Sequence, residues 1–189
     1  MRNPGRPILA VCALLLAGGF LAGCASGKPQ SLPTETPRST PTPVFTSDAQ
    51  ALAAATEVYK KYVRASDNIG HDGGADPERV RPYVNAAGLQ HEIESAQRIA
   101  DENARGYGYT KVNNTVLQSH EESHGIATVR MYACQDLTGV DLRDAAGTSL
   151  IAPDRADFIS YVAELRTNSH GQLVIQSNRY WSGGGICKH

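Results

Sequence analysis

The spacing of apolar residues changes once along the chain. From residue 47 to about residue 105, apolar residues recur every three or four positions, the period of an amphipathic helix. From residue 110 onward, apolar and polar residues alternate, which is typical of strands exposed on one face. The pattern predicts three helices followed by four antiparallel strands. We therefore expect an α+β domain whose helices cover one face of a curved antiparallel sheet.

The first helix is predicted to begin at Ser47, because Ser47 and Gln50 have the spacing of a capping box, and to continue through Asn68. Asp76 followed by a proline predicts the start of a second, short helix that ends near Val84. The positions at helical spacing in the first helix are Leu52, Ala55, Tyr59, Tyr62 and Ser66.

A third helix is predicted over residues 87–105, with Gly106 as its C-cap. The predicted strands cover residues 110–119, 126–135, 158–167 and 173–181. In the second strand one face comprises Ala127, Val129, Met131 and Ala133.

The N-terminus has the layout of an export signal. Arg2 and Arg6 precede an apolar segment over residues 8–21, which is shorter than a membrane-spanning helix. The segment ends in Leu21-Ala22-Gly23-Cys24, which resembles the lipobox of bacterial lipoproteins. That resemblance implies cleavage before Cys24, a diacylglycerol on its sulfur, and a protein anchored by lipid to the extracytoplasmic face of the cell membrane. An ordinary cleaved signal, with Cys24 incidental, is the alternative.

The segment after the lipobox predicts a tether. Residues 25–46 contain five prolines and eight serines or threonines, a composition that buries too little apolar surface to fold. The chain is thus divided into a signal peptide (1–23), a lipid-anchored disordered linker (24–46) and a folded domain (47–189).

Several short motifs follow one another through the predicted domain. They are the tyrosine pair Tyr59 and Tyr62, Pro82-Tyr83-Val84, Gly106-Tyr107-Gly108, Cys134-Gln135-Asp136-Leu137-Thr138, Asp144 with Gly147, and Trp181 with Cys187. In this order they resemble the nuclear-transport-factor-two-like (cystatin-like cone) domain of actinobacterial-type lipoproteins. The first strand of that fold is not evident in this sequence; either it is very short, near residues 69–74, or it is missing.

Cys134 and Cys187 are the two cysteines of the domain. Outside the membrane, a pair of otherwise unexplained thiols is most economically a disulfide, and the resemblance pairs the same two positions. Metal binding or a redox-active pair is the alternative, although the two residues lack the close spacing of such sites.

The resemblance also implies a cavity between the helices and the sheet. Five aromatic residues are candidates to line it, and their alternative role is packing in the core with a polar tip bonded to a partner. These candidates are Tyr59, Tyr62, Tyr132, Tyr161 and Trp181.

One motif suggests chemistry that its context does not support. His120-Glu121-Glu122-Ser123-His124 matches the zinc peptidase signature, which requires both histidines on one face of a helix. Here the flanking residues alternate and Gly125 follows directly, so a hairpin turn is expected. No metal ligand or other cofactor is predicted, and a zinc peptidase is a remote alternative.

Charge removes one class of function. Loss of Arg2 and Arg6 with the signal changes the net charge from −1 to −3, and such a chain has no general attraction for nucleic acid. Because no catalytic set can be assigned, the sequence favours a non-catalytic binding module of the cell envelope. Its partner would be an envelope protein or a small apolar ligand. The alternative is a cone-type isomerase, dehydratase or cyclase that acts on a small apolar substrate.

Overall fold

The structure, a computed structural model, describes residues 42–183 and 185–187. The predicted signal peptide, Cys24 and most of the predicted linker lie outside the described residues. Two α-helices, one 3₁₀ helix and six strands are found in the described part of the chain. In order they are α1 (Asp48–His71), η1 (Pro77–Val80), α2 (Ala86–Asp101), β1 (Arg105–Tyr107), β2 (Lys111–Ser123), β3 (Ile126–Asp136), β4 (Asp141–Arg143), β5 (Phe158–Thr167) and β6 (Leu173–Tyr180).

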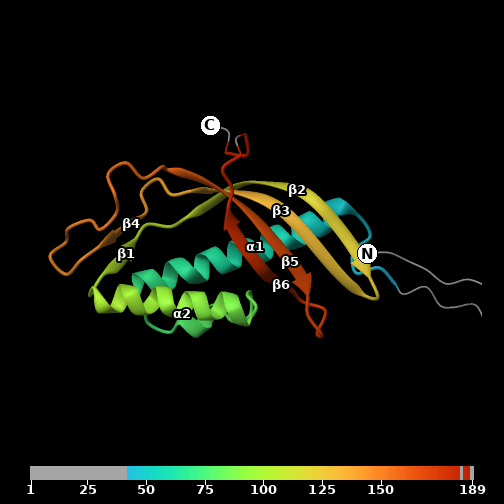
Figure 1. The fold of residues 1–189 in the computed structure, drawn as a ribbon, viewed down its shortest axis with the longest axis horizontal. Helices are drawn as coiled ribbons and strands as arrows, with labels where there is room; N and C mark the ends of the chain where they lie inside the picture. The colour runs from blue at the N-terminus through green and yellow to red at the C-terminus, as the bar shows by residue number, and fades with distance from the viewer. Residues whose placement is uncertain (1–41, 184, 188–189) are drawn as a thin grey trace, which may run out of the picture. The chain divides into compact units, whose positions relative to one another are not determined.

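The main sheet has four antiparallel strands in the order β2-β3-β5-β6. Both helices pack against the same face of this sheet, as Figure 1 shows, and the domain is therefore of the α+β class that the sequence predicted. Among the described residues, no helix is long and apolar enough to cross a membrane.

The core lies between α1 and the inner face of the sheet. The inner positions predicted for β3 are fully buried, and Ala163 and Leu165 of β5 extend the same surface. From α1 the core receives Ala51, Ala55 and Tyr59. The small alanine side chains permit a close approach of the helix to the strands, while Tyr59 fills the space toward β6.

Helix α1 begins as predicted and ends later. Ser47 Oγ accepts a hydrogen bond from the backbone N–H of Gln50 at 3.2 Å. At the other end Gly73 has a φ of 69°, and the N–H of Gly74 donates to the carbonyl of Ile69 at 2.8 Å. This is a Schellman motif, which glycine favours because a left-handed backbone costs it little.

The second predicted helix is shorter than expected. It is a single 3₁₀ turn, after which the chain forms a parallel β-bridge between Val84 and Ile175 of β6. The N–H of Ile175 donates to the carbonyl of Tyr83, and the N–H of Asn85 donates to the carbonyl of Ile175. These bonds draw the chain onto the edge of β6 and prevent a longer helix.

Helix α2 ends before the predicted residue 105. Asn103 adopts a φ of 50°, and the N–H of Ala104 donates to the carbonyl of Ile99 in a second Schellman motif. Gly106 is therefore not a C-cap; it lies in β1. A Cβ atom at Gly106 would lie 3.1 Å from the carbonyl carbon of Gly70, which shows how closely β1 crosses the end of α1.

The β1–β4 pair was not predicted. Arg105 pairs with Arg143 and Tyr107 with Asp141, in a ladder of three residues. Figure 1 shows this pair at the end of α1 that lies away from the β2–β3 hairpin. Residues 69–74, where a short strand was considered, form the end of α1 and its turn.

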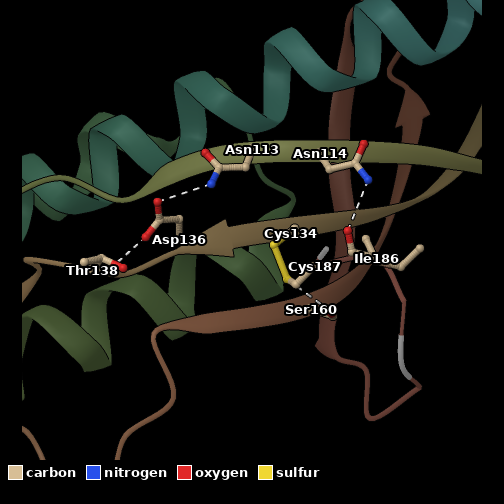
Figure 2. Close-up of a disulfide and its surroundings, with 8 residues drawn as sticks. All are labelled: Asn113, Asn114, Cys134, Asp136, Thr138, Ser160, Ile186 and Cys187. Atoms are coloured by element: carbon tan, nitrogen blue, oxygen red, sulfur yellow. Dashed lines mark hydrogen bonds between the residues drawn. A yellow bond between two sulfur atoms is a disulfide. The ribbon is translucent and has the colours of Figure 1, made fainter. Parts of the chain in front are cut away.

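The disulfide between Cys134 and Cys187 is present, with an S–S distance of 2.07 Å and a Cα–Cα distance of 5.1 Å. It holds the chain after β6 against the outer face of the sheet (Figure 2). Asn114 Nδ2 donates to the carbonyl of Ile186 at 3.1 Å, and Ser160 Oγ contacts Cys187 Sγ at 3.4 Å. The tail is thus fixed by one covalent bond and by polar contacts to β2 and β5.

Two residues of the predicted linker belong to the folded domain. The backbone N–H groups of Val44 and Phe45 donate to the two carboxylate oxygens of Glu122, each at 2.8 Å. Phe45 is partly buried against the core and contacts the ring of His120 edge-on. The predicted linker, which ended at residue 46, was therefore too long. Amino-acid composition cannot reveal a hydrogen bond to a carboxylate that is distant in the sequence.

Candidate functional site: a polar cleft between the helices and the sheet

Two adjoining hollows lie between the helices and the sheet, beside the first half of β5 and the second half of β6. Their volumes are about 300 Å³ and about 190 Å³, and both are lined by Tyr62, Tyr161 and Asn178. His91 of α2 lines the larger hollow, and Asp67 of α1 lines the smaller one. We call the two hollows together the polar cleft, because hydrogen-bonding side chains dominate its lining.

A β-bulge directs Asn178 into the polar cleft. Ile175 pairs with Leu165 and Ser177 pairs with Glu164, so Gln176 is the extra residue of β6. The bulge shifts the alternation by one position, and Asn178 therefore lies on the same face of the sheet as Ile175. This irregularity is what brings an amide to the cleft.

The bulge is held in place by the cap of α2. Asn85 Oδ1 accepts the N–H of Gly88 at 2.8 Å, which caps the helix, and Asn85 Nδ2 donates to the carbonyl of Gln176 at 3.1 Å. One side chain thus satisfies both the helix end and the bulged carbonyl. The wall of the cleft formed by α2 and the wall formed by β6 are joined at this residue.

A chain of hydrogen bonds orients the Asn178 amide. Gln135 Nε2 donates to the Tyr59 hydroxyl at 2.9 Å, and that hydroxyl donates to Asn178 Oδ1 at 3.2 Å. Tyr59 is fully buried, and burial raises its pKa above the ordinary value, so the phenol keeps its proton. With Oδ1 engaged, Nδ2 of Asn178 is the atom of the amide that is available to a ligand.

A second network fixes Tyr62 with the opposite polarity. The Tyr62 hydroxyl donates to Glu92 Oε1 at 2.7 Å, and Ser66 donates to Glu92 Oε2 at 3.0 Å. Burial, followed by the charge of Glu92, raises the pKa of Tyr62 far above its ordinary value. Because its proton is directed to Glu92, the Tyr62 oxygen can serve a ligand only as an acceptor.

Asp67 is the carboxyl group that lines the cleft. Its two oxygens accept hydrogen bonds from the N–H and the hydroxyl of Thr110, both at 2.9 Å. Burial raises the pKa of Asp67, and the bonds from Thr110 oppose that shift. Tyr161 of β5, whose pKa is also raised by burial, lines the smaller hollow as well.

The structure divides the five aromatic candidates into three groups. Tyr62 and Tyr161 line the polar cleft, while Tyr59 lies beneath it in the core. Tyr132 and Trp181 do not line the cleft; they contact each other on the opposite face of the sheet, with ring centroids 4.4 Å apart. The reason is the period of two, which places Tyr132 opposite to the buried residues on either side of it in β3.

Two important residues of the site were not identified from the sequence. Glu92 lies among Leu89, Ile93 and Ala96 on the apolar face of α2, and a carboxylate in that position was a signal that a buried partner exists. Asn178 carried no such signal. Uninterrupted alternation in β6 places it on the outer face, and only the bulge reverses this.

The zinc peptidase alternative is not supported by the geometry. His120 lies within β2, and His124 lies in the β2–β3 turn with a φ of 53°. His120 contacts Asp48 at 3.1 Å and Glu122 at 3.0 Å, so it belongs to the attachment of the N-terminal segment. Within the part of the chain that the structure describes, no group of three or more His, Cys, Asp or Glu residues could hold a metal ion.

No protein-family model matches the chain, and no curated protein is significantly similar to it. Among solved structures, the intermembrane space region of the chloroplast protein ARC6 superimposes with a TM-score of 0.51 at 10% identity, covering 70% of this chain and 97% of that one. The periplasmic domain of DotI (TM-score 0.44, 8% identity, 74% and 98% covered) and Aln2 from a Streptomyces species (0.42, 16%, 71% and 91%) are more distant. At such low identity the likeness to ARC6 shows a shared fold.

Proposed function

We propose that the protein is an extracytoplasmic module, anchored to the cell membrane by lipid on Cys24, that binds a small polar ligand in the polar cleft. The sequence alone suggested an envelope protein or a small apolar ligand as the partner. The lining of the cleft changes the expected chemistry, because the groups that face it donate and accept hydrogen bonds.

The observation that carries the proposal is the fixed polarity of two side chains. Asn178 presents a donor and Tyr62 presents an acceptor, and each is held by a buried partner, Tyr59 in one case and Glu92 in the other. Side chains that are already oriented lose little entropy when a ligand binds. A volume of about 300 Å³ is at the lower limit of ordinary ligand pockets, which suits a small molecule.

The same hydrogen bonds favour binding over catalysis. Hydrogen bonds donated to a carboxylate stabilise its charged form and make it a weaker base, although each oxygen keeps a second lone pair. Both oxygens of Asp67 accept bonds from Thr110, and both oxygens of Glu92 accept bonds from Tyr62 and Ser66. The two acids of the site are therefore engaged in holding the walls of the cleft together.

A cone-type enzyme is the second candidate, and Asp67 is the observation that favours it. This carboxyl lines the cleft and has a raised pKa, as a general base of an isomerase or dehydratase often does. Turnover of a carbonyl substrate by the purified protein, lost in Asp67→Asn, would support the enzyme and contradict the binding module.

The membrane anchor rests on the first 24 residues. A positive start, an apolar segment and Leu21-Ala22-Gly23-Cys24 support export and lipidation. Membrane fractions of an expressing bacterium should contain the protein with the mass of a diacylglycerol added, and Cys24→Ala should remove that mass. An unchanged mass in the variant would refute lipidation at this residue.

Ligand binding is tested with a panel of small polar compounds, such as amino acids, hydroxy acids and nucleosides, screened against the whole protein by ligand-observed NMR. For any compound that binds, Asn178→Leu and Tyr62→Phe should weaken the affinity about tenfold, the effect of one lost hydrogen bond. Tyr180→Phe, which alters an exposed tyrosine outside the cleft, is the matched control. Binding that is equal in all variants would contradict the proposed site.

A further inference from the structure

A hollow separate from the polar cleft lies on the outer face of the sheet, which neither helix covers. Its volume is about 260 Å³. Its floor is formed by Tyr132, Val162 and Trp181, which lie over β3, β5 and the end of β6. We call it the outer groove, and it is separated from the polar cleft by the sheet itself. The side chains that surround this floor are polar or charged, and they are Gln118, Arg130, Glu164, Ser177 and Arg179.

The aromatic floor is fixed before any ligand arrives. The rings of Tyr132 and Trp181 lie 4.4 Å apart at an angle of 41°. The backbone N–H of Trp181 donates to the carbonyl of Ser160 at 2.9 Å, which continues the pairing of β6 with β5. On the tail side, Gly183 lies against the six-membered ring of Trp181, where a Cβ would be only 2.1 Å from the ring.

Further along the tail, Cys187 is joined to Cys134 of β3 by the disulfide (Figure 2). A rigid aromatic surface that is already in place loses little conformational freedom on binding.

The rim offers both donors and acceptors. Arg130 Nε donates to Glu164 Oε2 at 2.7 Å across the β3–β5 ladder, and this bond restricts the movement of both side chains. Gln118 is the bulged residue of β2, which brings its amide to the same side. Among the described residues, Arg179 has no acidic partner within ion-pair distance.

We infer that the outer groove binds a saccharide. A sugar ring has an apolar face of C–H groups, which packs on an aromatic ring, and an edge of hydroxyl groups, each of which both donates and accepts hydrogen bonds. The groove has the complementary arrangement, with Tyr132 and Trp181 on the floor and an amide, a carboxylate and guanidinium groups on the rim.

Other ligand classes fit this arrangement less well. A purely apolar ligand would cover Arg130, Glu164 and Gln118 without satisfying their hydrogen bonds, which is costly. A simple anion would be repelled by Glu164 and would make no use of the aromatic floor. A sheet face, unlike a sheet edge, offers no free backbone groups to an extended peptide.

The single tryptophan of the chain makes the inference directly testable. Trp181 is the single tryptophan of the sequence, so a change in tryptophan fluorescence reports a change in the surroundings of this ring. The whole protein is titrated with chitotriose and, separately, with maltotriose. We expect a saturable shift of the emission with at least one of them, and Glu164→Gln and Arg179→Ala should each weaken the affinity about tenfold.

Two control variants distinguish the outer groove from the rest of the protein surface. Arg166→Ala changes an exposed arginine on the same face of β5 but outside the groove, and it should leave the affinity unchanged. Tyr62→Phe alters the polar cleft, and it should also leave the affinity unchanged, which distinguishes the outer groove from the site of the proposed function.

Three results would overturn the inference. One is the absence of a fluorescence change with every oligosaccharide tested. Another is an equal response to inorganic phosphate, which would indicate an anion site at Arg179. The third is a change that depends on protein concentration alone, which sedimentation would identify as self-association through this face.

Discussion

The hydroxyl of the buried residue Tyr59 donates a hydrogen bond to Oδ1 of Asn178 at 3.2 Å. The two residues are 119 positions apart, in the first helix and the last strand, and this bond connects the core to the candidate binding site. Removing the hydroxyl should therefore affect both stability and recognition, because the core and the cleft share one hydrogen-bonded chain.

Tyr59→Phe should lower the free energy of unfolding by about 1–3 kcal/mol, because it removes the hydrogen-bond partner of the buried Gln135 amide and of the partly buried Asn178 amide. Urea denaturation monitored by circular dichroism measures the change. Tyr180→Phe is the control, since Tyr180 is 70% exposed and its loss should change the stability by less than about 0.5 kcal/mol. Equal stability of the two variants would show that the buried network contributes nothing.

Gly74 is where the turn after α1 touches α2. Its φ is 85°, and a Cβ there would lie 2.1 Å from the carbonyl oxygen of Ala96. Gly74→Ala should therefore combine the cost of a left-handed backbone, about 1–2 kcal/mol, with a steric clash of about 1–3 kcal/mol. Thermal unfolding of this variant measures the total loss of stability.

Gly171→Ala separates these two costs. Gly171 has a φ of 74° in the β5–β6 hairpin, and a Cβ there would have no neighbour within 4 Å. This variant should show only the backbone cost, so Gly74→Ala should be clearly the less stable of the two. If both variants melt at the same temperature, α1 and α2 do not pack as closely as the structure indicates.

The main elements of the fold were accessible from the sequence because the periodicity is strong. The alternation through β3 identified the inner face of the sheet correctly, and Ala127 and Met131 are both fully buried. The same alternation already implied that Tyr132 faces away from the helices. Its assignment to the inner cavity came from the resemblance to cone domains and did not follow from the pattern.

The features that escaped prediction depend on contacts between distant residues. The β1–β4 pair has only three residues per strand, too few for a periodic signal. Asn178 reaches the cleft because of a bulge at Gln176, and the bulge is stabilised by Asn85, which is 91 positions earlier. No local pattern contains such information.

The disulfide should contribute substantially to stability. It closes a loop with a sequence separation of 53 residues, for which the restriction of the unfolded chain corresponds to about 4 kcal/mol. Cys187→Ser should therefore unfold at a markedly lower urea concentration than the oxidised protein. The double variant Cys134→Ser/Cys187→Ser should behave in the same way. A single variant as stable as the oxidised protein would show that the bridge is dispensable.

The attachment of the N-terminal segment to Glu122 should make stability depend on pH. Partial burial acts to raise the pKa of Glu122, but the N–H groups of Phe45 and Val44, together with His120, outweigh it, and the pKa lies below its ordinary value. A carboxyl whose pKa is lowered by folding stabilises the folded state at every pH above its unfolded pKa. That contribution is lost as the pH falls through the folded pKa.

Glu122→Gln tests this linkage. An amide has only one oxygen, so it can accept a bond from either Val44 or Phe45 but lacks the charge and the second acceptor. The variant should be less stable than the wild type near neutral pH, and the difference should shrink in acid as Glu122 of the wild type becomes protonated. Urea unfolding of both proteins, repeated from neutral to acidic pH, measures the difference in their stability.

Glu121→Gln is the matched control for this series. Glu121 is the preceding residue of β2 and is exposed, and among the described residues the hydrogen bonds of Val44 and Phe45 go to Glu122 and not to Glu121. Its variant should follow the stability of the wild type at every pH. If Glu122→Gln also follows the wild type throughout, the carboxylate does not hold residues 44 and 45, and the point at which the tether leaves the domain is not fixed by β2.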